Sequence, residues 1–143
     1  MILYCDTSAL VKCYCRETGS DAVLTARRRA EVTAICVVGY AEFHSAINRK
    51  RRDGDLTAHD AERVLRDFDT DWDCLVRVEI SPDLNKIVAR LLRTYPLRAF
   101  DALHLASALL LRSQLPQTHV SFSGFDGKPC LAAERERLTV VTD

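Results

Sequence analysis

Short apolar runs alternate with longer amphipathic segments along the whole chain, and this alternation restricts the fold more than any other sequence feature. The first run, residues 1–5, stops abruptly at Asp6. Uninterrupted apolar runs of this kind are typical of strands buried on both faces of a parallel sheet. Helical segments between such strands can cover the sheet, so the pattern predicts parallel α/β layering.

Hydrophobic periodicity and capping signals give the order of the elements. Ser81 and Pro82, for example, are a helix start signal, with serine at the N-cap and proline at the first helical position. Strands are expected at residues 1–5, 32–34, 75–80, 119–122 and 139–141. Helices are expected at residues 9–15, 21–30, 37–52, 57–71, from 82 onward, 98–112 and 131–137, with a loop at 123–129.

The chain has the length and apolar content of one globular domain. It has 143 residues, of which 48% are hydrophobic, so a single domain spanning residues 1–143 can bury one sizeable core. Lysine and arginine together number 20, as do aspartate and glutamate. This balance argues against binding nucleic acid through a large positive field, but acidic residues around metal ions can form a nuclease site within a neutral total.

The six cysteines are scattered and include no Cys-x-x-Cys pair. Zinc sites use paired spacings, and disulfide frameworks belong to short secreted chains, so the cysteines are interpreted as reduced, mostly core residues. No secretory signal is visible, and no apolar run approaches the roughly 18 residues that a membrane span needs. A soluble, cytoplasmic protein without membrane association is expected.

Two acidic residues lie at positions suited to a site near the first strand. Asp6 ends that strand, and ligands of open parallel sheets gather beyond the carboxyl ends of strands. The alternative is that Asp6, Thr7 and Ser8 only cap the next helix. Glu42 lies in a helix, bordering its apolar stripe, where a buried carboxylate would need a partner. Its alternative is an ordinary glutamate on a helix surface.

Two further acidic residues belong to the second half of the chain. Asp101 lies in an apolar helical segment, near the first turn, where the helix dipole alone would also favour a negative charge. Asp126 follows the fourth expected strand, and because glycine comes next, the pair can equally be a turn signal.

Considered together, the four acidic residues predict a metal site. Carboxylates that converge at one sheet edge repel one another unless a cation neutralises them, and Mg²⁺ or Mn²⁺ prefers such oxygen ligands. Paired ions of this kind can activate water for hydrolysis of a phosphodiester. Such a site needs no catalytic histidine, and His104, three residues after Asp101, is interpreted as a satisfied core residue.

Three segments resemble the sequence motifs of PIN domains, in particular the VapC-type toxins of VapBC toxin–antitoxin pairs. Residues 4–12 read YCDTSALVK, residues 40–46 read YAEFHSA, and residues 97–106 read LRAFDALHLA. Their order and spacing agree with the family. The resemblance implies a PIN-like three-layer α/β/α fold with a central, mainly parallel sheet of about four to five strands.

The same resemblance implies the site and its partners. Asp6, Glu42 and Asp101 match the acidic residues of the family's Mg²⁺ or Mn²⁺ site, and Thr7 and Ser8 match neighbours that hydrogen-bond within it. The implied substrate is single-stranded or looped RNA. The implied partners are a cognate VapB-like antitoxin that masks the site and, by analogy, a second copy of the chain in a homodimer.

The fourth family motif departs from the pattern. An ungapped comparison puts Ser123 where the family has an acidic residue, whereas Asp126 fits only with a small insertion, and Asp126 is the favoured candidate. The basic run at residues 49–52 suits the end of a helix, where cations stabilise the dipole, but it could also contact RNA phosphates.

The function predicted from the sequence is a metal-dependent endoribonuclease, the toxin of a toxin–antitoxin pair, with Asp6, Glu42, Asp101 and Asp126 as metal ligands. An alternative is a catalytically degenerate PIN domain that acts as a protein- or RNA-binding module. A third possibility is a metal phosphatase acting on small substrates.

Overall fold

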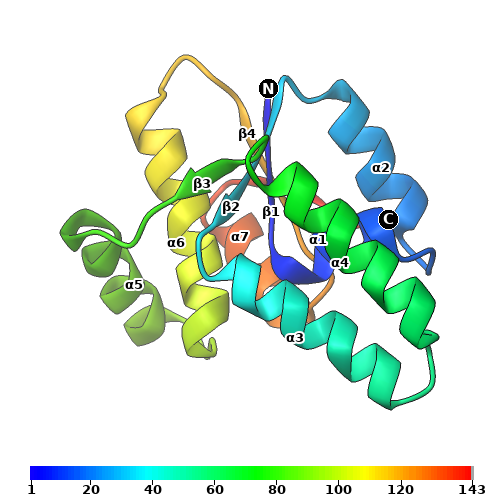
Figure 1. The fold of residues 1–143 in the computed structure, drawn as a ribbon. Coiled ribbons are helices and arrows are strands. Elements are labelled where there is room, and N and C mark those ends of the chain that lie inside the picture. Colours follow the sequence, from blue (N-terminus) through cyan, green and yellow to red (C-terminus); the bar gives the residue numbers. More distant parts are fainter. Residues whose placement is uncertain (143) are drawn as a thin grey trace.

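The computed structural model describes residues 1–142; Asp143, the last residue of the expected domain, lies outside the described residues. Strands and helices alternate as expected (Figure 1). The strands are β1 (Ile2–Cys5), β2 (Val32–Cys36), β3 (Val76–Val78), β4 (Val120–Ser123) and β5 (Thr139–Val141). The helices are α1 (Thr7–Tyr14), α2 (Ser20–Arg29), α3 (Gly39–Arg52), α4 (Ala58–Trp72), α5 (Pro82–Thr94), α6 (Ala99–Gln114) and α7 (Gly127–Arg135).

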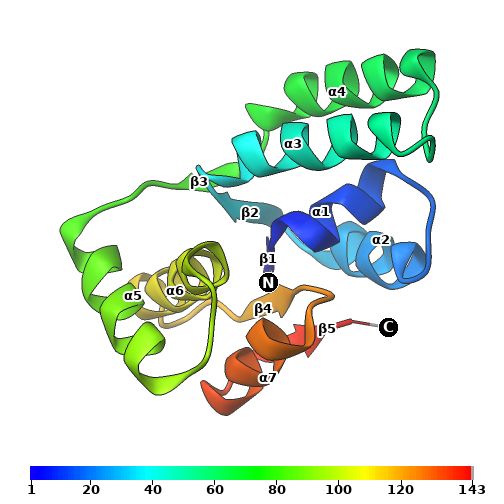
Figure 2. The same ribbon diagram turned by 90° about the horizontal axis from the view of Figure 1, so that it is seen from below.

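The strands form one parallel sheet in the order β3-β2-β1-β4-β5. In the central strand, β1, all four residues are buried, because helices cover both faces. Ile2 and Tyr4 belong to the core cluster under α5, α6 and α7, whereas Leu3 and Cys5 belong to the cluster under α1 to α4. Figure 2 shows these two helical layers on opposite sides of the sheet. The expected three-layer α/β/α fold is therefore confirmed.

Helices α3 and α4 form a hairpin that extends the layer of α1 to α4 away from the sheet (Figure 2). Phe43 of α3 and Phe68 of α4 are fully buried and stack with ring centroids 3.8 Å apart and planes inclined by 13°. Trp72 packs against Phe68 with ring centroids 5.5 Å apart. This aromatic cluster, between the start of α3 and the end of α4, fixes the two helices relative to one another.

The structure corrects the expected elements between β4 and β5. The predicted loop at 123–129 is shorter, because β4 includes Ser123 and α7 begins at Gly127, four residues before the predicted helix at 131–137. Pro129 was interpreted as a loop residue, but it occupies the first turn of α7. Proline is tolerated there because the first backbone N–H groups of a helix have no intrahelical partner. Elsewhere, β2 extends to Cys36 and β3 contracts to residues 76–78.

The cysteines and the helix lengths agree with what the sequence predicts for residues 1–142. All six cysteines are free thiols, and Cys5, Cys15, Cys36 and Cys130 are buried, whereas Cys74 is exposed. None of the helices in this part of the chain combines the length and the apolar character needed to cross a membrane.

Candidate active site

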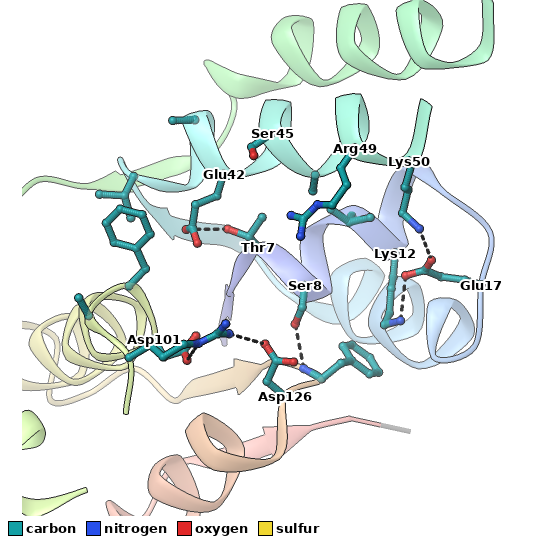
Figure 3. A pocket seen from close by; sticks show the side chains of 18 of the residues that line it. Thr7, Ser8, Lys12, Glu17, Glu42, Ser45, Arg49, Lys50, Asp101 and Asp126 are labelled. Atoms are coloured by element: carbon teal, nitrogen blue, oxygen red, sulfur yellow. Dashed lines mark hydrogen bonds and ion pairs between the residues drawn. The ribbon is translucent and has the colours of Figure 1, made fainter. Parts of the chain in front are cut away.

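A hollow of about 1220 Å³ opens at the edge of the sheet where β1, β2 and β4 end. It lies between α1, α3, the start of α6 and the turn between β4 and α7 (Figure 3). Five of the six residues predicted for the site line it: Thr7, Ser8, Glu42, Asp101 and Asp126. The fold therefore gathers acidic residues from three separate segments into one pocket.

Asp6, the sixth predicted residue, lies behind this lining and is only 5% exposed. Its Oδ1 accepts hydrogen bonds from the Ser8 hydroxyl at 2.6 Å and from the Ala9 N–H at 2.9 Å. The capping interpretation is thus correct, since Asp6 is the N-cap of α1, yet the residue also adjoins the pocket. Burial raises the pKa of Asp6, and the bond from Ser8 offsets only part of that effect.

Glu42 is held by two side chains, Thr7 from α1 and the buried His104 from α6. Its Oε1 accepts from the Thr7 hydroxyl at 2.9 Å and lies 2.6 Å from Nε2 of His104 (Figure 3 shows the Thr7 bond). Burial acts to raise the pKa of Glu42, but the hydrogen bonds from His104 and Thr7 outweigh it, so the pKa is lowered. Glu42 is therefore a fixed, ionised carboxylate at the pocket wall.

The orientation of His104 follows from a buried hydrogen-bond chain. The Tyr4 hydroxyl accepts from the Cys36 N–H at 2.9 Å and lies 2.8 Å from Nδ1 of His104. A hydroxyl that accepts from an N–H can donate its own proton onward, which makes Nδ1 the acceptor and Nε2 the donor to Glu42. His104 is a satisfied core residue, as predicted, but it also positions an acidic residue of the pocket, and the sequence interpretation missed that contact.

Arg98 is the second residue that the sequence interpretation missed. It precedes α6, and its side chain is 80% exposed. Its Nε donates to Oδ2 of Asp101 at 3.2 Å, and its Nη2 lies 3.8 Å from Oδ2 of Asp126. The guanidinium therefore bridges two of the acidic residues. The signal for this contact was the three-residue spacing of Arg98 and Asp101 at the start of a helix.

The structure distinguishes the two candidates for the fourth motif by where they lie. Ser123 is fully buried, and its hydroxyl donates to the Val141 carbonyl of β5 at 3.0 Å. Asp126 is the N-cap residue of α7, but its side chain makes no capping hydrogen bond and instead lines the pocket. The Asp126 carboxylate therefore faces the pocket, which is what the comparison of the fourth motif with a small insertion expects.

The donor chemistry of the pocket fits a hard divalent cation, because its acidic groups offer only carboxylate oxygens. Within residues 1–142, however, no three side chains of the histidine, cysteine, aspartate or glutamate type lie close enough together to hold one metal ion. Arg98 takes up the space between Asp101 and Asp126. Holding a metal between these two acidic residues would require the exposed Arg98 side chain to turn away.

A tight backbone approach fixes Asp6 against the β4–α7 turn. A Cβ atom built on Gly124 would lie 2.6 Å from Oδ2 of Asp6 and 2.9 Å from Cε1 of Phe122. Ser8 strengthens the same junction, since its hydroxyl accepts from the Phe125 N–H at 2.9 Å. The absence of a side chain at Gly124 therefore lets Asp6 and the turn approach one another.

Gly124→Ala is expected to destabilise the chain by about 1–3 kcal/mol, because the added methyl group overpacks this junction. Urea denaturation measures the loss. Gly127→Ala is the matched control, since a Cβ there meets no atom within 4 Å, and its free energy of unfolding should change little. Equal stability of the two variants would contradict the packing argument.

An open parallel sheet with carboxylates gathered beyond its strand ends defines an α/β protein of the kind whose ligands bind at that edge. The chain belongs to the PIN domain family and, within it, to the VapC group: the PIN domain model matches residues 3–118, and a VapC relative is similar over most of both chains. That relative, Ribonuclease VapC45 of Mycobacterium tuberculosis, is 32% identical over 108 residues, which cover 76% of this chain and 75% of the relative.

Solved structures share the fold at low sequence identity. VapBC2 of Rickettsia felis, solved with a DNA fragment from its promoter, is similar with a TM-score of 0.65 and 14% identity, over 98% of this chain and 97% of that chain. VapC20 of Mycobacterium tuberculosis, described as a toxin that cleaves the sarcin-ricin loop, is similar with a TM-score of 0.62 and 14% identity, over 91% of this chain and 94% of that chain.

Proposed function

We propose that this chain, acting as a single PIN domain in the cytoplasm, is a metal-dependent endoribonuclease and the toxin of a toxin–antitoxin pair. The observation that carries the proposal is the convergence of Glu42, Asp101 and Asp126 on one pocket, with Asp6 directly behind it. Membership of the VapC group, in which a relative is named a ribonuclease, supports RNA as the substrate.

In this proposal Asp6, Glu42, Asp101 and Asp126 hold one or two Mg²⁺ or Mn²⁺ ions. When bound, such ions supply a water molecule of lowered pKa and positive charge beside the leaving oxygen of the phosphodiester. The chain itself keeps the ligands aligned. Thr7 and His104 fix Oε1 of Glu42, while Ser8 ties Asp6 to the turn that carries Asp126.

A VapB-like antitoxin that covers the pocket is part of the same proposal. The similar structure from Rickettsia felis is a VapBC complex, which supports a partner of this kind. A homodimer is also proposed, and sedimentation equilibrium of the purified chain tests it.

The test of the proposed function is cleavage of single-stranded and looped RNAs by the purified chain in Mn²⁺ and in EDTA. We expect cleavage in Mn²⁺, none in EDTA, and no turnover of a generic phosphomonoester. Turnover of the phosphomonoester without RNA cleavage would instead indicate a phosphatase.

A binding module with a degenerate site is the second candidate. It is favoured by one observation, that no three potential ligands among residues 1–142 lie within reach of one ion. RNA binding that needs no metal, combined with an absence of cleavage across diverse RNAs, would support this alternative over a nuclease.

Arg98→Gln is expected to tighten Mn²⁺ binding about two- to tenfold. Arg98 forms ion pairs with two of the proposed ligands, and a metal ion that binds both ligands must break these pairs. Exposed ion pairs contribute roughly 0.2–1 kcal/mol each. Calorimetric titration of the metal-free protein with Mn²⁺ measures the change. Arg93→Gln, which removes an exposed cation from the last turn of α5, is the control and should leave the affinity unchanged. Weaker Mn²⁺ binding by the Arg98 variant would show that Arg98 supports the site instead of competing with the metal.

A further inference from the structure

The pocket continues past its acidic residues to an end lined by cations. Lys12 from α1 and both Arg49 and Lys50 from the last turn of α3 line this basic end (Figure 3). The acidic end and the basic end belong to one continuous hollow, with Thr7 and Ser8 between them. A ligand that spans the hollow therefore meets carboxylates at one end, and at the other end three cations that outnumber the carboxylates of Glu17 and Asp53.

Two of the cations are fixed by one shared carboxylate. Nζ of Lys12 lies 2.9 Å from Oε1 of Glu17, and Nζ of Lys50 lies 3.0 Å from Oε2 of the same side chain. The Lys12 ammonium also lies over the Phe125 ring, 4.5 Å from its centroid. These three charged groups form a cluster with one excess positive charge, and the Lys12 ammonium covers one face of the Phe125 ring.

Arg49 adds a cation that this cluster does not neutralise. Its side chain is exposed, and Figure 3 shows its guanidinium reaching into the hollow between Thr7 and the lysine cluster. Unlike Lys50, Arg49 forms no ion pair with any of residues 1–142. If Arg49 only stabilised the dipole of α3, its side chain would not need to enter the hollow and could extend into solvent.

We propose that Arg49, together with the Lys12–Glu17–Lys50 cluster, is a phosphate-binding subsite that holds the RNA strand beside the bond to be cleaved. This inference rests on the proposed function and extends it by naming a substrate-positioning residue. A guanidinium suits the role because it can donate two parallel hydrogen bonds to one phosphate. The metal-binding acidic residues alone would repel the neighbouring phosphates, and the excess positive charge at the basic end compensates for that repulsion.

A phosphate contact has a signature that a structural role does not share. It adds affinity to every RNA sequence alike, and it releases about 0.7 counterion per contact on a single strand, so it steepens the dependence of binding on salt. Loss of a merely structural arginine would change the stability of α3 without changing that salt dependence.

The test measures binding of fluorescein-labelled single-stranded RNA by anisotropy over a series of salt concentrations. The chain carries Asp101→Asn and the buffer contains EDTA, so that bound RNA stays intact. Arg49→Gln is expected to weaken binding about three- to tenfold and to reduce the slope of log K against log salt by about 0.7. Arg51→Gln, which removes the same charge from the same turn of α3 but lies outside the pocket, is the matched control.

The outcomes separate this inference from the proposed function. If the wild-type chain cleaves RNA while Arg49→Gln and Arg51→Gln share one salt slope, the subsite is wrong and the nuclease stands. If the unsubstituted chain neither binds nor cleaves RNA, both are wrong. A reduced slope confined to the Arg49 variant, together with unchanged thermal unfolding, supports the subsite.

Discussion

Asp101→Asn is expected to slow RNA cleavage by more than about a hundredfold, because removal of groups that only orient metal ligands already costs 10- to 100-fold. The substitution preserves the shape of the side chain and removes its charge, so the proposed metal site loses an anionic ligand while the surrounding packing stays the same. Asp101 is half-buried, and within residues 1–142 its one ion pair is with the exposed Arg98 at 3.2 Å. Stability should therefore change by less than about 1 kcal/mol.

The cleavage rate at saturating Mn²⁺ measures this effect, with circular dichroism and thermal unfolding to show that the fold is retained. Asp53→Asn is the matched control, because Asp53 also lines the hollow but lies at the far end of α3. We expect the control to cleave at close to the wild-type rate. A folded Asp101 variant that retained more than about a tenth of the activity would remove Asp101 from the set of metal ligands.

Phe68→Ala is expected to destabilise the fold by about 3–5 kcal/mol, which is a large part of the 5–15 kcal/mol typical of a whole protein. Phe68 is fully buried, stacks on Phe43 and meets Tyr14 edge-on with ring centroids 5.8 Å apart. Because α4 packs mainly on α3, a cavity at this position removes the stacked contact that joins the start of α3 to the end of α4.

Urea denaturation of the purified variant measures the loss. Leu65→Ala, on the same helix but only partly buried, should cost less than half as much. A Phe68 variant as stable as the Leu65 variant would mean that the aromatic cluster closes around the gap or contributes little to the stability of the hairpin.

The fold was largely predictable because its signals are local. Residues 1–5 form an apolar run that ends in an acidic residue, and they became the buried central strand. The start of α7 was missed because Gly127 and Pro129 are turn signals in isolation, whereas the first turn of a helix tolerates both.

The site was only partly predictable. The positions of Asp6 and Asp101 at a strand end and a helix start indicated the pocket from the chain alone. The contacts of His104 with Glu42 and of Arg98 with Asp126 join residues far apart in the sequence, 62 positions in the first case, and no local pattern encodes them. Whether the acidic residues bind metal stays a prediction.

The chain through Tyr4 joins the pocket to the hydrophobic centre of the molecule. Tyr4 is wholly buried, its ring is stacked on Phe122 with centroids 5.8 Å apart, and its hydroxyl anchors His104 and hence Glu42. Burial raises the pKa of Tyr4 well above its ordinary value, which favours the neutral hydroxyl that donates to His104. Repacking this core for greater stability would also change the orientation of Glu42, so the interior and the pocket of this protein have to be engineered as one unit.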